Sequence, residues 1–362
     1  MYDYFRIKHR EGERRKLGAV GKIFARKRYI CIMIQKIRAL LGAILLTASL
    51  SGGTAPAIRQ GELRTERYVY TGGVTDGKQN GYGVCRYTNG NVYYGFWNMG
   101  YKDGLGRLVY ADGTMEFGRW RNGRLAKERK QKFTPGCKVY GIDVSKHQKT
   151  FDWTKLALRA RADGTVRRGG TGDKFLQPVL FALMKSTEGV TVVDPTFKRN
   201  FAQAKRCGII RGAYHFLSVS SDVDEQVKSF IANTPLEAGD FPPVLDLEID
   251  KEVMRRQHTK VCAMAKKWLT LIERHYGVKP IIYTYENYYK DYLKGHGFDS
   301  YDFWIARYGK EPSARKWEIW QFTDKGRISC IDHNVDIDLF RGDYRELKKY
   351  VKTKGIKERE GR

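Results

Sequence analysis

At the centre of the chain stands Phe241-Pro242-Pro243-Val244-Leu245-Asp246-Leu247-Glu248, a short apolar run that is entered through prolines. Such a run is typical of a buried strand. Because side chains alternate along a strand, Asp246 and Glu248 share one face, and Leu245 and Leu247 share the other. Two carboxylates held together on a buried face repel each other, so that one pKa rises. The stretch predicts either a proton-donating acid beside a charged carboxylate, or a strand end with two solvated acids.

Similar strand-like runs recur through the C-terminal two-thirds of the chain, and helical stretches separate the earlier ones. Alternation of strand and helix predicts a parallel sheet. Eight strands in about two hundred residues predict an α/β fold, a modified TIM-type (β/α) barrel with fewer helices near its end. The expected helices span 195–207, 222–233 and 253–276. The expected strands span 139–145, 181–189, 209–216, 244–248, 280–285, 303–308, 317–322 and 335–340.

Polar and aromatic residues lie at or near the ends of these expected strands. In a barrel of this type, residues at the C-terminal ends of strands build the active site. The candidates are Asp143, Glu188, Tyr214, His215, Asp246, Glu248, Tyr283, Trp304, Trp320 and Asp336.

The segment from about residue 139 to residue 345 resembles glycoside hydrolase family 25, the N-acetylmuramidase lysozymes. Its motifs occur in the order found in that family. They are Gly141-Ile142-Asp143-Val144-Ser145 with His147-Gln148 and Asp152-Trp153, Lys185-Ser186-Thr187-Glu188-Gly189, Asp194-Pro195-Thr196-Phe197 with Asn200, Gly212-Ala213-Tyr214-His215-Phe216, Pro243 to Glu248, Trp304-Ile305-Ala306, Trp320-Gln321-Phe322 and Val335-Asp336.

The resemblance implies a modified barrel that cleaves the β-1,4 bond between N-acetylmuramic acid and N-acetylglucosamine in peptidoglycan. Carried over by motif, Glu248 is the general acid, and Asp246 is its charged neighbour, which stabilises an oxocarbenium-like or oxazolinium-like species. Asp143 and Asp336 are the other two acids of the site. No cofactor and no metal are expected.

The remaining candidates are expected to bind substrate, each with a structural alternative. Aromatic rings offer faces on which sugars stack, but bare aromatic residues are about as often part of a core. His147 and His215 belong to motifs and are either functional or structural. The expected substrate-binding residues are Tyr214, Tyr283, Trp304, Trp320, His215 and Glu188.

Three features depart from the pattern of the family. Lys149 stands where glycine is often found, and Asp338 stands where asparagine is common. An insert at about 157–177 contains the glycine-rich stretch 169–172. It lacks the strand and the Lys-Ser/Thr pair of a phosphate-binding loop, so a surface loop is expected. None of these departures removes an acid.

Residues 68–125 contain an internal repeat with a period of 23, in which Gly81-Tyr82-Gly83 recurs as Gly104-Leu105-Gly106 and Gly95-Phe96-Trp97 as Gly118-Arg119-Trp120. Asn-Gly and Asp-Gly turns between aromatic runs predict a small all-β module of stacked hairpins. The pattern resembles MORN repeats, with two repeats and a truncated third. The module is either a structural spacer or a surface that contacts the cell envelope, a membrane or a partner protein. A polar linker is expected at 126–138.

The N-terminal 57 residues have the composition of a targeting segment. Residues 39–50 are apolar, Lys36 and Arg38 precede them, and small residues follow at 51–57. This run is shorter than the roughly 20 residues that span a bilayer, so a cleaved signal peptide is expected, with Met33 as a natural start. The predicted protein is exported, periplasmic or secreted. The alternative is a membrane anchor formed by an uncleaved signal.

The chain is strongly basic, with a net charge of +27, and it ends in a basic tail at 346–362. Residues 1–38 hold twelve Lys/Arg and three Asp/Glu, so their removal lowers the charge to +18. No nucleic-acid motif accompanies the charge, and nucleic acid is not an expected partner. Attraction to an anionic cell envelope explains the charge, as does a merely solvated surface. The six cysteines form no disulfide framework or zinc pattern.

Two functions from different classes remain open on the sequence. The first is an active muramidase with peptidoglycan as its partner, probed by clearing of a peptidoglycan suspension. The second is a catalytically weak cell-wall-binding or scaffold protein. Retention of all four acids that the resemblance identifies favours the first. A monomer is expected.

Overall fold

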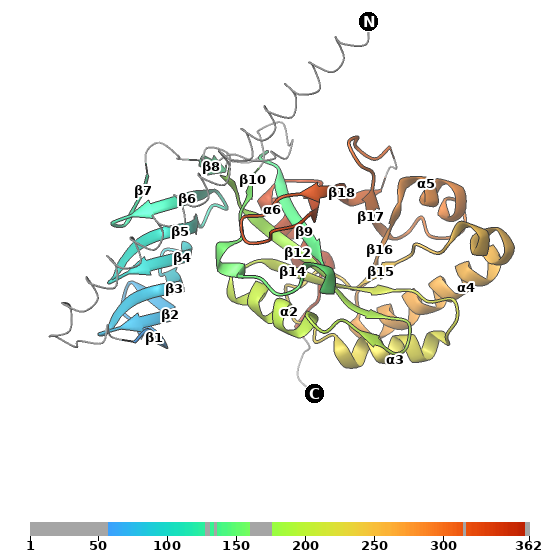
Figure 1. Ribbon diagram of the computed structural model, residues 1–362, viewed down its shortest axis with the longest axis horizontal. Helices are drawn as coiled ribbons and strands as arrows, with labels where there is room; N and C mark the ends of the chain where they lie inside the picture. The colour runs from blue at the N-terminus through green and yellow to red at the C-terminus, as the bar shows by residue number, and fades with distance from the viewer. Residues whose placement is uncertain (1–56, 127–130, 134–135, 160–175, 314–315, 359–362) are drawn as a thin grey trace, which may run out of the picture. The chain divides into compact units, whose positions relative to one another are not determined.

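The structure is a computed structural model that describes residues 57–126, 131–133, 136–159, 176–313 and 316–358 (Figure 1). Residues 58–362 form one compact unit. The expected export signal lies outside the described residues, as does the glycine-rich part of the insert. No helix in the described part of the chain has the length and apolar character needed to cross a membrane.

The N-terminal part of this unit is an antiparallel sheet of hairpins, as predicted. It begins at Arg59, earlier than the repeat indicates, and residues 131–133 of the expected linker form a strand that pairs with the sheet. The strands are β1 (Arg59–Arg64), β2 (Tyr68–Thr75), β3 (Lys78–Tyr87), β4 (Val92–Asn98), β5 (Tyr101–Val109), β6 (Met115–Arg121), β7 (Arg124–Leu125) and β8 (Gln131–Phe133).

Glycines and aromatic rings explain why the repeats stack as a sheet. Gly83 and Gly95 are direct partners across β3 and β4, and Gly106 follows on β5. A Cβ atom at Gly106 would lie 2.1 Å from the Tyr93 hydroxyl, so only glycine leaves room for that ring. Trp120 packs edge-on against Tyr93 at 5.3 Å between ring centroids. Tyr93 covers the glycine pair Gly95 and Gly106, and one repeat earlier Tyr70 covers Gly72 and Gly83.

The C-terminal part is a closed barrel of eight strands, which confirms the predicted fold class. Neighbouring strands are parallel except around the last one, which pairs antiparallel with both of its neighbours and thereby closes the barrel. The barrel strands are β9 (Val139–Val144), β12 (Val179–Glu188), β14 (Ile210–Phe216), β15 (Val244–Asp246), β16 (Ile281–Tyr285), β17 (Asp302–Ala306), β18 (Trp317–Gly326) and β19 (Val335–Phe340). Three short strands lie outside it, namely β10 (Leu158–Arg159), β11 (Leu176–Gln177) and β13 (Val192–Val193).

Helices cover the first strands of the barrel and become fewer near its end, as predicted. The long helix α4 begins at its N-cap Asp250, whose carboxylate accepts from two backbone N–H groups, and ends at Gly277, which has a φ of +69°. Helices α3 and α4 pack together on the outside of the barrel (Figure 1). The helices are α2 (Phe197–Arg206), α3 (Val223–Asn233), α4 (Lys251–Tyr276), α5 (Glu286–Tyr288) and α6 (Tyr344–Lys354), with short helices η2 (Lys146–Gln148), η3 (Trp153–Lys155) and η4 (Tyr289–Leu293).

The hairpin sheet packs against the N-terminal ends of the barrel strands. Phe117 of the sheet belongs to the same buried apolar cluster as Val139 and Phe181, which stand at the starts of β9 and β12. The guanidinium of Arg107 is buried and donates to the carbonyl of Gly208 at 2.8 Å, just before β14. The opposite ends of the strands are therefore left for the site.

Candidate active site

Five carboxyl groups converge inside the barrel at the C-terminal ends of the parallel strands. Asp143 is the last residue but one of β9, Asp246 ends β15, and Glu248 follows two residues later on the same side. Asp336 and Asp338 come from β19, which runs in the opposite direction, so its N-terminal end reaches this mouth. Asp336 is the direct partner of Asp143 across that strand pair. The four acids predicted from the sequence are thus brought together.

Burial and mutual repulsion keep these acids from ionising at their usual pH. Burial, followed by repulsion from Asp336, raises the pKa of Asp143 well above its ordinary value. Burial, followed by repulsion from Glu248, also raises the pKa of Asp246 well above its ordinary value. The pKa of Glu248 is also raised by burial, while hydrogen bonds from Tyr283 and Tyr285 act against the rise. Burial raises the pKa of Asp336 to about 6. The site therefore retains protons near neutral pH.

Three of the five acids carry a buried oxygen without a hydrogen-bond partner among the described residues, namely Asp246 Oδ1, Glu248 Oε1 and Asp338 Oδ2. An unpartnered buried carboxyl oxygen is costly, and such groups in native structures usually serve a function. Glu248 is only partly buried, whereas Asp246 is 6% exposed. Of the pair, Glu248 is therefore the more accessible to a substrate.

A glutamine that the sequence reasoning missed orients one of the acids. Gln321 Nε2 donates to Asp143 Oδ2 at 2.8 Å. Its Oε1 accepts from the hydroxyls of Tyr283 at 3.0 Å and Tyr308 at 3.2 Å. Gln321 lies two residues beyond the inward-facing Ile319, so strand alternation could have identified it.

The aromatic candidates Tyr214, Tyr283 and Trp304 form the wall of the site. The rings of Tyr283 and Trp304 lie 4.2 Å apart, and those of Tyr214 and Trp304 lie 6.0 Å apart. Trp304 is 1% exposed, and its Nε1 donates to Asp338 Oδ1 at 2.8 Å. With so little of its ring exposed, Trp304 supports the acids rather than offering a sugar a free face.

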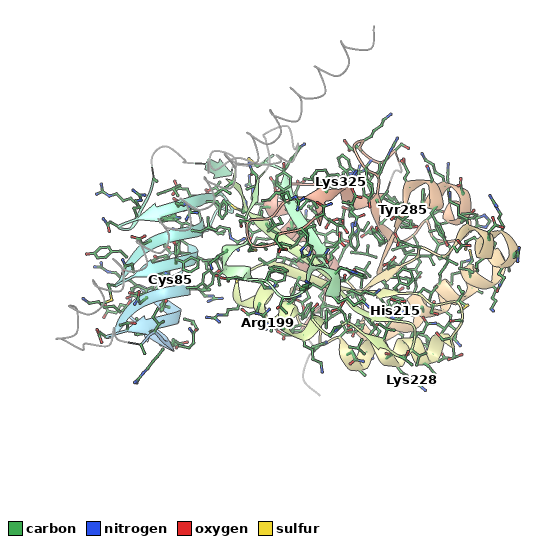
Figure 2. All side chains as sticks on the ribbon, viewed as in Figure 1. Cys85, Arg199, His215, Lys228, Tyr285 and Lys325 are labelled. Carbon is green, nitrogen blue, oxygen red and sulfur yellow. The ribbon has the colours of Figure 1, made fainter. Side chains whose placement is uncertain are left out.

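Two tyrosines that were not predicted supply exposed rings at the mouth. Tyr285 is 43% exposed and Tyr308 is 46% exposed, and their ring centroids lie 6.5 Å apart. Figure 2 labels Tyr285 near the end of β16. Exposed aromatic faces beside the acids are suited to stack on sugar rings.

His215 does not reach the acids, contrary to its prediction as a substrate-binding residue. It alternates with the inward-facing Tyr214 and therefore points outward, under α3 and α4 (Figure 2). Its ring is fully buried, stacks on Trp268 at 5.4 Å, and contacts Thr187 Oγ1 at 2.7 Å and Gln226 Oε1 at 3.1 Å. Burial lowers its pKa to about 4. His215 is a satisfied core residue.

Trp320 also does not reach the acids, contrary to its prediction as a substrate-binding residue. It alternates with the inward-facing Gln321, packs against the apolar cluster outside the barrel, and donates its Nε1 to the carbonyl of Arg307 at 2.7 Å. Its ring therefore lies behind the wall of the site.

Glu188 lies beside the acids and is joined to a lysine that the sequence reasoning missed. Lys185 Nζ contacts Glu188 Oε2 at 2.6 Å. The Lys185 charge lowers the pKa of Asp246, and the Glu188 charge raises it. Both side chains therefore lie close to Asp246. Lys185 thus supplies a positive charge within a cluster of carboxylates. Among the described residues, no group of three or more His, Cys, Asp or Glu could hold a metal ion.

Comparison with known proteins agrees with this geometry. The model of glycosyl hydrolases family 25 matches residues 142–331, and the MORN repeat model matches residues 70–92 and 93–115. An uncharacterized protein of Escherichia coli K12, YegX, is 34% identical over 223 residues, which cover 61% of this chain and 75% of YegX.

Relatives with named activities are more distant. Lysozyme M1 of Streptomyces globisporus is 28% identical, over 56% of this chain and 68% of its own length. An N,O-diacetylmuramidase of Arthroderma benhamiae is 25% identical, over 59% of this chain and 87% of its own length. The crystal structure of a lysozyme from Streptomyces coelicolor superposes with a TM-score of 0.50 at 25% identity, over 60% of this chain and 98% of that one. By its family match and its acid-lined barrel, the chain belongs to glycosyl hydrolases family 25 and carries MORN repeats ahead of the barrel.

Proposed function

We propose that this chain is a muramidase that hydrolyses the β-1,4 bond between N-acetylmuramic acid and N-acetylglucosamine in peptidoglycan. The observation that carries the proposal is the pair of carboxyls Asp246 and Glu248, whose pKa values are both raised and which each have one buried oxygen without a hydrogen-bond partner among the described residues. Two relatives that are named a lysozyme and an N,O-diacetylmuramidase support it.

Glu248 acts as the proton donor. Burial raises its pKa, so it holds a proton that it can pass to the glycosidic oxygen as the bond between that oxygen and the anomeric carbon breaks. Its partial exposure places it within reach of a bound sugar. The hydroxyl of Tyr285, which hydrogen-bonds to Glu248, stabilises the carboxylate that remains.

Asp246 stabilises the positive charge that develops on the sugar. The charge of Glu248 raises the pKa of Asp246, so a proton on Glu248 removes this repulsion and favours the ionised form of Asp246, while the Lys185 charge lowers the pKa of both acids. A carboxylate in a site of low dielectric interacts strongly with an oxocarbenium-like or oxazolinium-like species. Water then adds to the anomeric carbon, and its proton passes to a carboxylate of the cluster. Asp336, with a pKa of about 6, is ionised near neutral pH and is available to accept it, and Asp143 is its direct partner across the strand pair.

Mass spectrometry of digested peptidoglycan tests the proposed reaction. After borohydride reduction, the new chain ends should be muramitol, because cleavage leaves a reducing N-acetylmuramic acid. Ends on N-acetylglucosamine would identify a glucosaminidase, and 1,6-anhydro ends would identify a lytic transglycosylase. Either of these results contradicts the proposal.

Export completes the proposed function, since peptidoglycan lies outside the cytoplasm. The apolar run 39–50, with basic residues before it and small residues after it, is the proposed signal. N-terminal sequencing of the protein recovered outside the cytoplasm should begin between about residue 50 and residue 58. A protein that stays in the membrane fraction with its N-terminal segment intact would favour an uncleaved anchor.

A further inference from the structure

Lys149 has a backbone conformation that glycine favours. Its φ is +57° and its ψ is −149°. Three other described non-glycine residues with positive φ, Asp76, Met99 and Asn122, each precede a glycine in a hairpin turn. Lys149 is followed by Thr150 instead. A side chain at such φ and ψ angles strains the backbone, and strain of this kind persists mainly where function requires the residue.

The surrounding structure holds this backbone in place from both sides. The Lys149 N–H donates to the carbonyl of Lys146 at 3.1 Å, and the Lys149 carbonyl accepts from Asn200 Nδ2 at 3.4 Å. Asn200 is fixed in turn, because its Oδ1 accepts from Trp153 Nε1 at 3.1 Å. Asp194 Oδ2 accepts from the Lys146 N–H at 2.6 Å. The position of Lys149 is therefore imposed by its neighbours.

The side chain of Lys149 is exposed in a groove at the mouth of the barrel. The groove has a volume of about 430 Å³ and is lined by residues 148–151 and 329–333. The first loop follows the strand that carries Asp143, and the second precedes the strand that carries Asp336. His333 Nε2 contacts the carbonyl of His147 at 3.0 Å and so joins the two loops. Both loops of the groove therefore lie at the end of the barrel where the acids stand.

The ammonium of Lys149 is exposed to solvent, and one carboxylate of the groove, Asp332, is influenced by its charge. Asp332, the carboxylate that lines the same groove, pairs with His333 at 2.6 Å. The hydrogen bond with His333 and, more weakly, the charge of Lys149 lower the pKa of Asp332, while no described carboxylate lies within ion-pair distance of Lys149. Residues of the groove other than Asp332 carry no negative charge.

We propose that Lys149 binds a carboxylate of the peptide stems that branch from the muramic acid residues of peptidoglycan. The inference rests on the proposed function and names a part of that substrate. Peptide stems carry carboxylates on acidic side chains and at their C-terminus, whereas the adjacent N-acetylglucosamine is uncharged. An exposed ammonium beside the mouth can pair with such a carboxylate while the glycan occupies the site. The charge on the side chain is then the reason that lysine is kept at a strained position.

Two substitutions separate the charge from the strain. Lys149→Ala removes the ammonium and keeps the strain, and Lys149→Gly removes both. We expect both variants to raise KM for peptidoglycan about two- to fivefold at low ionic strength, the effect of one exposed ion pair, with kcat unchanged. The KM difference from wild type should disappear in about 1 M salt. Lys149→Gly alone should raise Tm by a few degrees.

Chemical neutralisation of the substrate provides the matched comparison. Peptidoglycan treated with a carbodiimide and ammonia carries amides in place of carboxylates. On this substrate the wild type and both variants should have the same KM. Lys228→Ala, which removes an exposed lysine of α3 that pairs with Glu225, should behave as wild type throughout.

Three results would overturn the proposal. They are an unchanged KM of Lys149→Ala on native peptidoglycan, an equal rise of its KM on native and amidated substrates, and a Tm of Lys149→Gly no higher than that of wild type. Failure of the proposed function would be recognised separately, because the wild type would then leave native peptidoglycan uncut.

Discussion

The two ends of the barrel differ in what fills them. At the C-terminal ends of the parallel strands, Asp143, Asp246 and Asp338 are buried with raised pKa values, and several of their neighbours are acids as well. At the N-terminal ends, the interior is apolar and continues into the hairpin sheet through Phe117. Burying acids at the C-terminal ends of the strands, the mouth, lowers the stability of the fold. The apolar packing at the N-terminal ends, the base, holds those acids in place.

The largest effect is expected from a substitution at the mouth. Glu248→Gln keeps the shape of the side chain but removes its ability to donate a proton. Hydrolysis of peptidoglycan should therefore fall by about 100-fold or more, measured as release of reducing ends. The melting temperature should not fall, because burial of an ionisable group has been replaced by burial of a neutral one. Near-normal activity in the folded variant would remove Glu248 from the role of proton donor.

A substitution at the base tests the other half of the comparison. Phe117→Ala leaves a cavity between the hairpin sheet and the barrel, which should reduce the free energy of unfolding by about 3 kcal/mol or more. Activity at low temperature should stay within about twofold of wild type, because the mouth is untouched.

Tyr101→Ala is the matched control, since Tyr101 is an aromatic residue of the same sheet that is 61% exposed. It should leave both stability and activity unchanged. A wild-type melting curve for Phe117→Ala would show that the hairpin sheet contributes nothing to the stability of the barrel.

A third prediction concerns Gln321, which lies between the acids and the tyrosines. Gln321→Leu removes the hydrogen bond that favours the ionised form of Asp143, so the pKa of Asp143 should rise further. If ionised Asp143 takes part in the reaction, kcat should fall about tenfold, and the acidic limb of the pH profile should move to higher pH.

The pH profile distinguishes this role from a merely structural one. A variant that loses activity equally at all pH values would show that Gln321 supports the fold and leaves the ionisation of Asp143 unaffected. Gln321→Glu is the complementary variant, since its added negative charge should raise the pKa of Asp143 by repulsion.

Much of this arrangement follows from the sequence. Alternating apolar runs predicted the barrel, and the glycine and aromatic period predicted the hairpin sheet. The four predicted acids meet because Asp143, Asp246 and Glu248 stand at the C-terminal ends of parallel strands, and Asp336 stands at the N-terminal end of the antiparallel strand β19. Two motif residues were predicted wrongly because side chains alternate along a strand, so that the residue next to an inward-facing one points outward. Tyr214 and Gln321 point inward, so His215 and Trp320 point away.

Contacts between segments that are far apart in the sequence could not be predicted from local sequence patterns. The insertion of Arg107 beneath Gly208 and the packing of Phe117 on the barrel depend on two surfaces that fit only after each has folded. The same holds for the charge of Lys185 beside Asp246, because its place near that acid is set by strand register.

The smallest expected effect concerns Asp338, which stands where asparagine is common in the family. Its Oδ1 accepts from Trp304 Nε1, while its Oδ2 is buried and has no hydrogen-bond partner among the described residues. Burial, and then the charge of Asp336, raises its pKa well above the ordinary value. The substitution Asp338→Asn would keep an acceptor for Trp304 and would remove a group that resists ionisation.

The sign of the pH dependence follows from the raised pKa. An acid whose pKa is higher in the folded state binds more protons there, so its contribution to stability is complete below the unfolded pKa, about 4. That contribution is lost as the pH rises from about 4 toward the folded pKa. Asp338→Asn should therefore match wild type near pH 4 and exceed it at pH 7, by about 1 kcal/mol, or a few degrees in Tm. A stability difference that does not change between pH 4 and pH 7 would mean that Asp338 titrates alike in the folded and unfolded chains, and that holding this carboxyl at the mouth costs the fold nothing.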